Sequence, residues 1–83
     1  MATAIRASEA TSDLEGRLVR PEWIGNISMS VYRVHGVTLD HGRLGLNLAN
    51  VGHAWGDVLA DGAPAEWCWF DTSAIIHVME QNF

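Results

Sequence analysis

The stretch from Met29 to Leu48, MSVYRVHGVTLDHGRLGLNL, constrains the fold of this chain most, because its pattern predicts a β-hairpin. A two-residue turn at His41 and Gly42 places the large aliphatic side chains on one face of that hairpin. The pairs on this face are Leu39 with Leu44, Val37 with Leu46 and His35 with Leu48, and Val31 and Met29 continue the row. A shift of one residue would scatter the set over both faces, so the pattern selects this register.

The turn and the opposite face agree with this hairpin. A type I′ turn needs positive φ at both central residues, which Gly42 accepts freely and His41 tolerates better than most residues. We expect Asp40 opposite Arg43 to add an ion pair worth roughly 0.2–1 kcal/mol. The outer face is predicted to carry Thr38, Gly36, Val34 and Tyr32 from the first strand and Gly45 and Asn47 from the second.

Shorter strands are predicted on both sides of the hairpin. Residues 17–20 alternate loosely, and we expect Pro21 to end that strand because proline has no N–H for a ladder. Residues 51–60 form a candidate third strand, followed by the turn dipeptide Asp61-Gly62.

The next predicted strand, residues 66–70, contains Trp67 and Trp69. A tight turn at residues 61–62 would place Trp67 opposite Gly56 and Trp69 opposite Ala54. Large rings would then cover small residues of the neighbouring strand, which is a favourable packing arrangement.

The segment from Asp71 to Glu80 is compatible with two structures. Its first residues could cap a helix, whereas the β-branched Ile75, Ile76 and Val78 favour a strand. We predict a strand, with a helix at residues 73–81 as the alternative.

These patterns predict an all-β fold, a small antiparallel barrel or sandwich of five to six short strands around the 29–48 hairpin. A C-terminal helix at 73–81 would make the fold α+β instead. The predicted β domain spans residues 17–83, and residues 1–16 are expected to form a flexible N-terminal arm, although residues 12–15 match a helix capping box. The core of an 83-residue chain is thin, so a homodimer or larger homo-oligomer is a further expectation.

Charge is distributed unevenly along the chain. All five cations are arginines within residues 1–43, where five carboxylates balance them. Residues 44–83 carry five carboxylates and no cation, which accounts for the net charge of −5. This half would repel phosphate backbones and attract a basic protein surface, so the sequence argues against direct nucleic-acid binding.

No pattern of catalytic, cofactor-binding or metal-binding residues is present. The available metal donors, which have no familiar short spacing, are His35, His41, His53, His77 and Cys68. Cys68 stands between two tryptophans, so we expect it to fill apolar space with its thiol pKa raised by burial. We therefore expect no enzyme, no cofactor and no metal. No apolar run approaches the ~20 residues that span a bilayer, and no signal peptide is evident, which predicts a cytoplasmic protein outside the membrane.

The sequence thus favours a protein that works by binding. We expect an acidic inhibitor or adaptor that docks on a basic surface of a larger protein complex, and nucleic-acid-handling machines are one class of partner with such surfaces. Small acidic inhibitors encoded by phages, the anti-CRISPR proteins among them, have this general size and charge, but no motif identifies that class. The predicted partner-binding residues are Asp57, Asp61, Glu66, Trp67, Trp69, Asp71, Tyr32 and Arg33.

Two alternative functions remain open at this point. The chain could be a structural β-domain that assembles into a homo-oligomer through its edge strands. It could also be a small barrel that binds single-stranded nucleic acid by stacking bases on Trp55, Trp67 and Trp69, although the aromatic strand lies in the half without cations.

Overall fold

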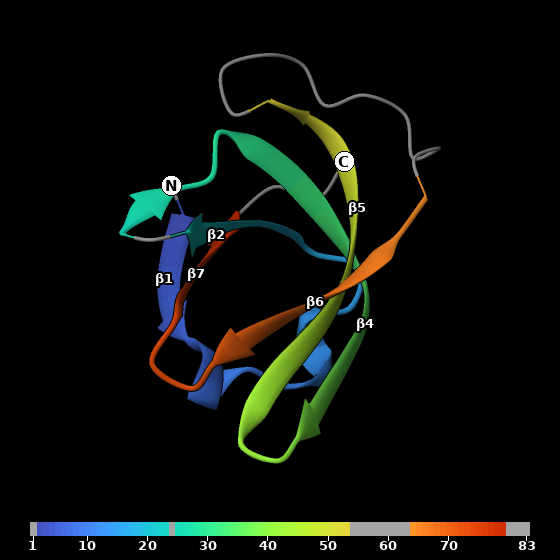
Figure 1. Ribbon diagram of the computed structural model, residues 1–83. Coiled ribbons are helices and arrows are strands. Elements are labelled where there is room, and N and C mark those ends of the chain that lie inside the picture. Colours follow the sequence, from blue (N-terminus) through green and yellow to red (C-terminus); the bar gives the residue numbers. More distant parts are fainter. Residues whose placement is uncertain (1, 24, 54–63, 80–83) are drawn as a thin grey trace.

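The computed structural model describes residues 2–23, 25–53 and 64–79, in which seven strands form one antiparallel sheet that curls around a core (Figure 1). The strands are β1 (Ala2–Arg6), β2 (Leu18–Trp23), β3 (Asn26–Ile27), β4 (Ser30–Asp40), β5 (Arg43–His53), β6 (Glu66–Asp71) and β7 (Ile75–Met79). Their order is β1-β7-β2-β4-β5-β6, and β3 pairs with β2. The predicted all-β fold is confirmed, and β7 occupies the segment for which a helix was the alternative. None of the described segments is a helix with the length and apolar character needed to cross a membrane.

The central hairpin has the predicted turn and, from Gly36 to Asn47, the predicted register. φ is 50° at His41 and 77° at Gly42, as a type I′ turn requires. β4 pairs with β5 over the whole hairpin, and the two predicted aliphatic pairs nearest the turn are present. The hairpin is longer than predicted, because residues 51–53 continue β5 and do not begin a third strand. The remainder of that predicted strand, residues 54–60, and the Asp61-Gly62 turn lie outside the described residues.

A β-bulge in β4 determines which residues of this strand face the core. The register shifts between Val34 and Gly36, so Val34 pairs with Leu48 and the predicted pair of His35 with Leu48 is wrong. His35 is the extra, exposed residue of the bulge. The predicted outward orientation of Val34 and Tyr32 is also wrong: Val34 is only 1% exposed, and Tyr32 packs against the core. One inserted residue reverses the alternation for everything that precedes it.

The same reversal removes Val31 and Met29 from the predicted core row. Val31 belongs to a second, smaller cluster with Leu18 and Val51, against which Met79 packs. Met29 is 55% exposed.

The main core lies inside the curl and collects buried residues from most elements. The hairpin contributes Val34, Leu44, Leu46 and Leu48, as the alternating pattern predicts for the second strand. The other buried members are Ala7, Ala10, Leu14, Val19, Phe70, Ile76 and Val78.

Pro21 lies inside β2, so the prediction that it ends this strand is wrong. It pairs with Ile76 of β7, and its carbonyl accepts a hydrogen bond of 2.7 Å from the backbone N–H of Ser28. The N–H and C=O of one residue point to the same side of an antiparallel strand. Pro21 therefore lacks a donor on the side of β2 that faces β3 and β4. On that side β2 pairs with β4 at residues 18–19 and with β3 at residues 22–23, and Pro21 lies between these two pairings.

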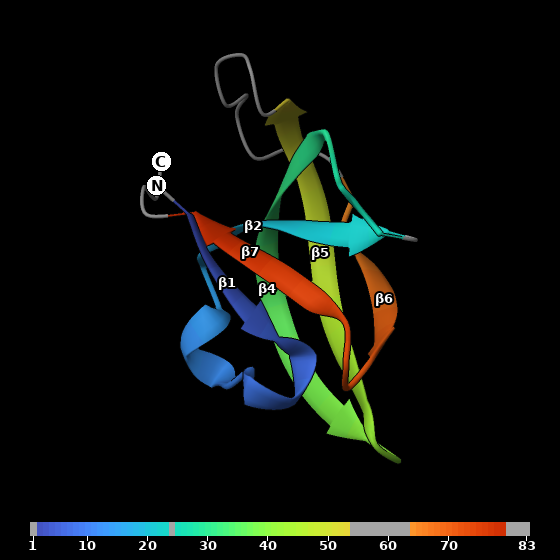
Figure 2. The ribbon, with the colours of Figure 1, turned by 90° about the vertical axis from the view of Figure 1, so that its left-hand side faces the viewer.

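The N-terminal residues join the sheet where we expected a flexible arm. β1 pairs with β7 at the edge of the sheet, and two short 3-10 helices follow, η1 (Ala7–Glu9) and η2 (Ser12–Leu14) (Figure 2). The N–H of Ala7 donates to the carbonyl of Ala74 at 2.8 Å, and the N–H of Ser8 donates to that of Thr72 at 3.1 Å. These bonds attach the segment after β1 to the turn between β6 and β7, which helps to hold the curl.

Candidate interaction site on strand β6

Four of the predicted partner-binding residues lie on β6, a strand at one end of the sheet order. Among the described strands, β6 pairs only with β5. Trp67 is 50% exposed and Trp69 is 40% exposed, and Glu66 and Asp71 are exposed at the two ends of the strand. Because successive side chains alternate, Phe70 between these exposed residues is buried in the core.

Glycines on the neighbouring strands make room for both indoles. A Cβ atom at Gly45 would lie 2.9 Å from Cζ3 of Trp69, and one at Gly36 would lie 3.2 Å from Cη2 of Trp67. A Cβ atom at Gly45 would therefore collide with the Trp69 ring, whereas one at Gly36 would make a tight contact with the Trp67 ring. The sequence suggested rings over small residues, and this is what the structure has.

The partners of the two rings differ from the predicted ones. Trp69 pairs with Gly45 and Trp67 pairs with Asn47, both on β5. The predicted partners, Ala54 and Gly56, lie outside the described residues. The prediction placed β6 against residues 54–60, whereas β6 pairs with the hairpin strand that precedes them.

Arg43 adds a cation to the exposed indoles. Its guanidinium carbon lies 5.2 Å from the ring centroid of Trp69, within the range of a cation–π interaction. The centroids of Trp67 and Trp69 are 6.4 Å apart, with an angle of 26° between their planes. We call Arg43, Trp67 and Trp69 the aromatic face. Sequence reasoning missed the role of Arg43 because it depends on β6 lying next to β5.

The expected ion pair between Asp40 and Arg43 is replaced by other contacts. The guanidinium of Arg43 lies over Trp69, and a carboxylate oxygen of Asp40 lies 3.3 Å from Nε2 of His41. The Asp40 carboxylate is exposed beside the hairpin turn.

The other predicted partner-binding residues have different surroundings. Tyr32 is partly buried against the core, and Nη1 of Arg33 donates a hydrogen bond of 2.7 Å to the carbonyl of Gly16. Asp57 and Asp61 lie outside the described residues. The structure therefore groups Glu66, Trp67, Trp69 and Asp71 on one strand. The partner-binding role of all eight residues stays a prediction.

Cys68 has the environment that its sequence neighbours indicate. It is half-buried and packs against the main core. Burial raises the pKa of the Cys68 thiol, and the nearby carboxylate of Glu66 raises it further. Both effects reduce the thiolate fraction near neutral pH, which is the opposite of what a nucleophilic cysteine needs.

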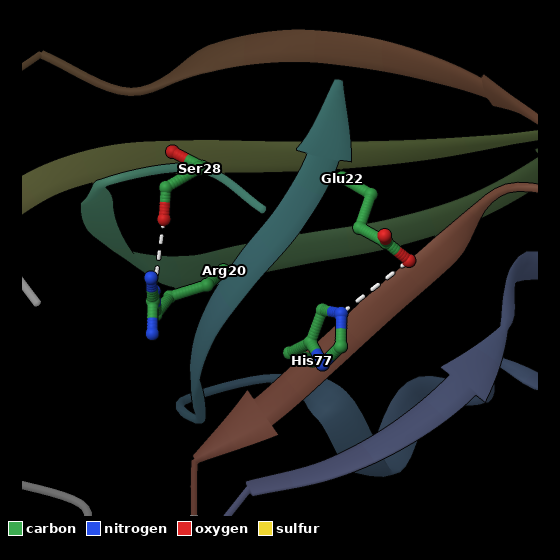
Figure 3. Close-up of polar contacts among 4 residues, drawn as sticks. All are labelled: Arg20, Glu22, Ser28 and His77. Atoms are coloured by element: carbon green, nitrogen blue, oxygen red, sulfur yellow. Dashed lines mark hydrogen bonds and ion pairs between the residues drawn. The ribbon is translucent and has the colours of Figure 1, made fainter. Parts of the chain in front are cut away.

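Away from the aromatic face, a polar contact joins β2 to β7. Nε2 of His77 lies 3.4 Å from a carboxylate oxygen of Glu22, and Nε of the nearby Arg20 donates to the carbonyl of Ser28 at 2.8 Å (Figure 3). Within residues 2–23, 25–53 and 64–79, no group of three or more histidine, cysteine or carboxylate side chains could hold a metal ion.

Comparisons with models of known protein families, with curated proteins and with solved structures find no match for this chain.

Proposed function

We propose that this chain is a non-catalytic binding protein, an inhibitor or adaptor that docks through the aromatic face on a basic surface of a larger protein. The observation that carries the proposal is the pair of exposed indoles on β6. Trp67 and Trp69 are both exposed, and they stand side by side on one strand. Tryptophan and arginine are the residue types most enriched among interface hot spots.

The backbone beneath the aromatic face supports this role. The rings lie over strands of a hydrogen-bonded sheet, with the ring tips close to the backbone of Gly36 and Gly45. Side chains that are already ordered lose little conformational entropy when a partner covers them. Docking would remove from water the part of each indole that is now exposed.

Charge indicates the chemistry of the partner. Glu66 and Asp71 flank the aromatic face on β6, and the Asp40 carboxylate is exposed at the adjacent hairpin turn. A basic partner surface would meet these carboxylates at the rim of the interface, where charge mainly increases the association rate and makes it depend on salt.

The test is capture of partners from host lysate with matched variants. The bait with Trp67→Ser and Trp69→Ser loses the aromatic face, whereas Ile27→Ser with Met29→Ser removes two exposed apolar side chains elsewhere. We expect the wild-type and control baits to recover the same basic protein, released by high salt, and the tryptophan variant to lose it. Circular dichroism checks that each bait is folded. Equal recovery with the tryptophan variant would contradict the proposal.

A second candidate is binding of single-stranded nucleic acid, which the stacked indoles and the guanidinium of Arg43 favour. Aromatic side chains on a strand can stack on bases, and arginine adds a cation. Titration with an oligothymidylate at low salt distinguishes the two candidates, because base stacking would quench tryptophan fluorescence in a saturable way. A saturable quench that the tryptophan variant lacks would favour this candidate over protein docking.

A further inference from the structure

A groove of about 410 Å³ lies where the end of β6 approaches the β2–β3 hairpin. Its walls are residues 69–71 of β6, the turn that leads into β7, and Glu22 and Gly25. Successive side chains of a strand point to opposite faces, so three consecutive residues can line one groove only along the backbone edge of the strand. β5 already occupies the other edge of β6. The groove therefore borders the outer edge of this strand.

An outer strand edge is suited to binding another strand. Alternate backbone N–H and C=O groups of an edge strand point away from the sheet, and an extended peptide can pair with them. Figure 2 shows β6 at the margin of the curled sheet, with the β2–β3 hairpin nearby.

The charges around the groove specify the occupant. Glu22 and Asp71 contribute carboxylates from the two walls, and no lysine or arginine is among the described lining residues. Two described basic groups adjoin these walls. Nε2 of His77 lies 3.4 Å from the Glu22 carboxylate, and Arg43 pairs with Asp71 across β5 and β6, with its guanidinium carbon 5.2 Å from the ring centroid of Trp69. Strand β6 of a second copy would bring two more carboxylates, from Glu66 and Asp71, and no cation. A cationic segment of another protein fits this edge better than self-association does.

We propose that the β6 edge takes up an extended segment of the partner protein as an additional strand, with a lysine or arginine of that segment between Glu22 and Asp71. This inference rests on the proposed function and adds the chemistry of the partner segment. The added strand would extend the sheet beside the aromatic face, so its outward side chains would lie next to Trp67 and Trp69.

The test uses a synthetic peptide as the probe, with an alternating valine and lysine sequence and blocked ends. An alternating valine and glutamate peptide of the same length is the control. Amide NMR signals of the full chain are followed during titration, together with hydrogen exchange. We expect the lysine peptide to shift the signals of residues 66–71 and to slow exchange in that strand, and the glutamate peptide to have no effect.

Charge variants locate the binding. Glu22→Gln and Asp71→Asn are expected to weaken the lysine peptide up to about fivefold each, the effect of a lost cross-strand charge pair. The matched control, Asp13→Asn with Glu15→Gln, removes two exposed carboxylates from another part of the surface and should leave the affinity unchanged. Equal binding of both peptides, no saturable binding at millimolar peptide, or the same affinity in Glu22→Gln and Asp71→Asn would each overturn the inference.

The capture experiment separates this inference from the proposed function. If the tryptophan variant loses the partner but the double variant Glu22→Gln with Asp71→Asn keeps it, docking through the aromatic face is supported and the added strand is contradicted. If only the charge variant loses the partner, binding at the β6 edge is supported and docking through the aromatic face is contradicted. Loss with both variants supports both proposals, and retention by both overturns both.

Discussion

At the scale of single residues, the aromatic face depends on two glycines that contribute no side chain. Gly36 and Gly45 lie beneath the tips of Trp67 and Trp69, so the exposed indoles occupy space that a Cβ atom would otherwise take. The backbone at neither glycine is in the left-handed region, and close approach of the rings is the feature that requires glycine.

We expect Gly45→Ala to displace the Trp69 ring and to lower the free energy of unfolding by about 1–3 kcal/mol, a usual cost of overpacking. The new Cβ would lie 2.9 Å from both Cζ3 of Trp69 and Cγ2 of Thr38, which confine it from two sides. Urea unfolding measures the stability, and tryptophan emission reports the ring.

Gly36→Ala is the matched comparison for this prediction. Its Cβ would lie 3.2 Å from the ring tip of Trp67, a contact that a small ring movement can relieve. Alanine also gains about 0.5–1 kcal/mol over glycine within a strand, so the net change should be close to zero. Equal changes in the free energy of unfolding for the two substitutions would show that contact with the ring does not determine the loss of stability.

At the scale of elements, the bulge in β4 has more effect on which side chains face the core than the position of any strand end. It directs Val34 and Tyr32 toward the core and leaves His35 exposed. Without it, Arg33, Val31 and Met29 would face the core in place of Val34 and Tyr32.

Deletion of His35 is expected to lower the free energy of unfolding by at least about 3 kcal/mol, because it would turn the buried Val34 outward, a loss comparable to truncating core side chains. His35→Ala keeps the extra residue and should stay within about 0.5 kcal/mol of the wild type, as for other exposed positions. Urea unfolding of both variants provides the measurement. A deletion variant as stable as His35→Ala would contradict the assigned role of the bulge.

The elements also separate what the sequence could predict from what it could not. The turn at His41-Gly42 and the alternation of Leu44, Leu46 and Leu48 are local, and both were predicted correctly. An inserted residue leaves no local signal, since the 29–35 pattern is acceptable in either register. Pro21 can lie within β2 because its missing N–H falls between the pairings of β2 with β3 and with β4. That arrangement is part of the tertiary structure and has no local sequence signal.

The candidate site follows the same division. The alternation placed Trp67 and Trp69 on one predicted strand, and they lie together on β6. That both are exposed did not follow from the sequence. Arg43, Gly36 and Gly45 become part of that face only because β6 pairs with β5, and strand neighbours are not encoded in any short stretch of sequence.

At the scale of the whole molecule, the sheet depends on its first strand. β1 covers one edge of β7, and the segment that follows it places Ala7 and Ala10 in the main core. Ile5 of β1 packs against this core as well.

Removal of residues 1–6 is expected to destabilise the fold by about 2–4 kcal/mol, which corresponds to the loss of one partly buried aliphatic side chain and a strand pairing. The exposed edge of β7 should also promote association between copies. Urea unfolding and light scattering measure the two effects, and Thr3→Ala, at an exposed position of β1, is the control. A truncated chain that remains monomeric and equally stable would contradict this account.

The pairing of β1 with β7 also determines when the protein can finish folding. The β4–β5 hairpin joins neighbouring residues and can form early, whereas β1 has no partner until β7 has emerged from the ribosome. Contacts between such distant parts of a chain slow folding. Throughout synthesis the nascent chain therefore carries an unpaired strand and an open core, and its native state is reached only after translation has passed the last strand.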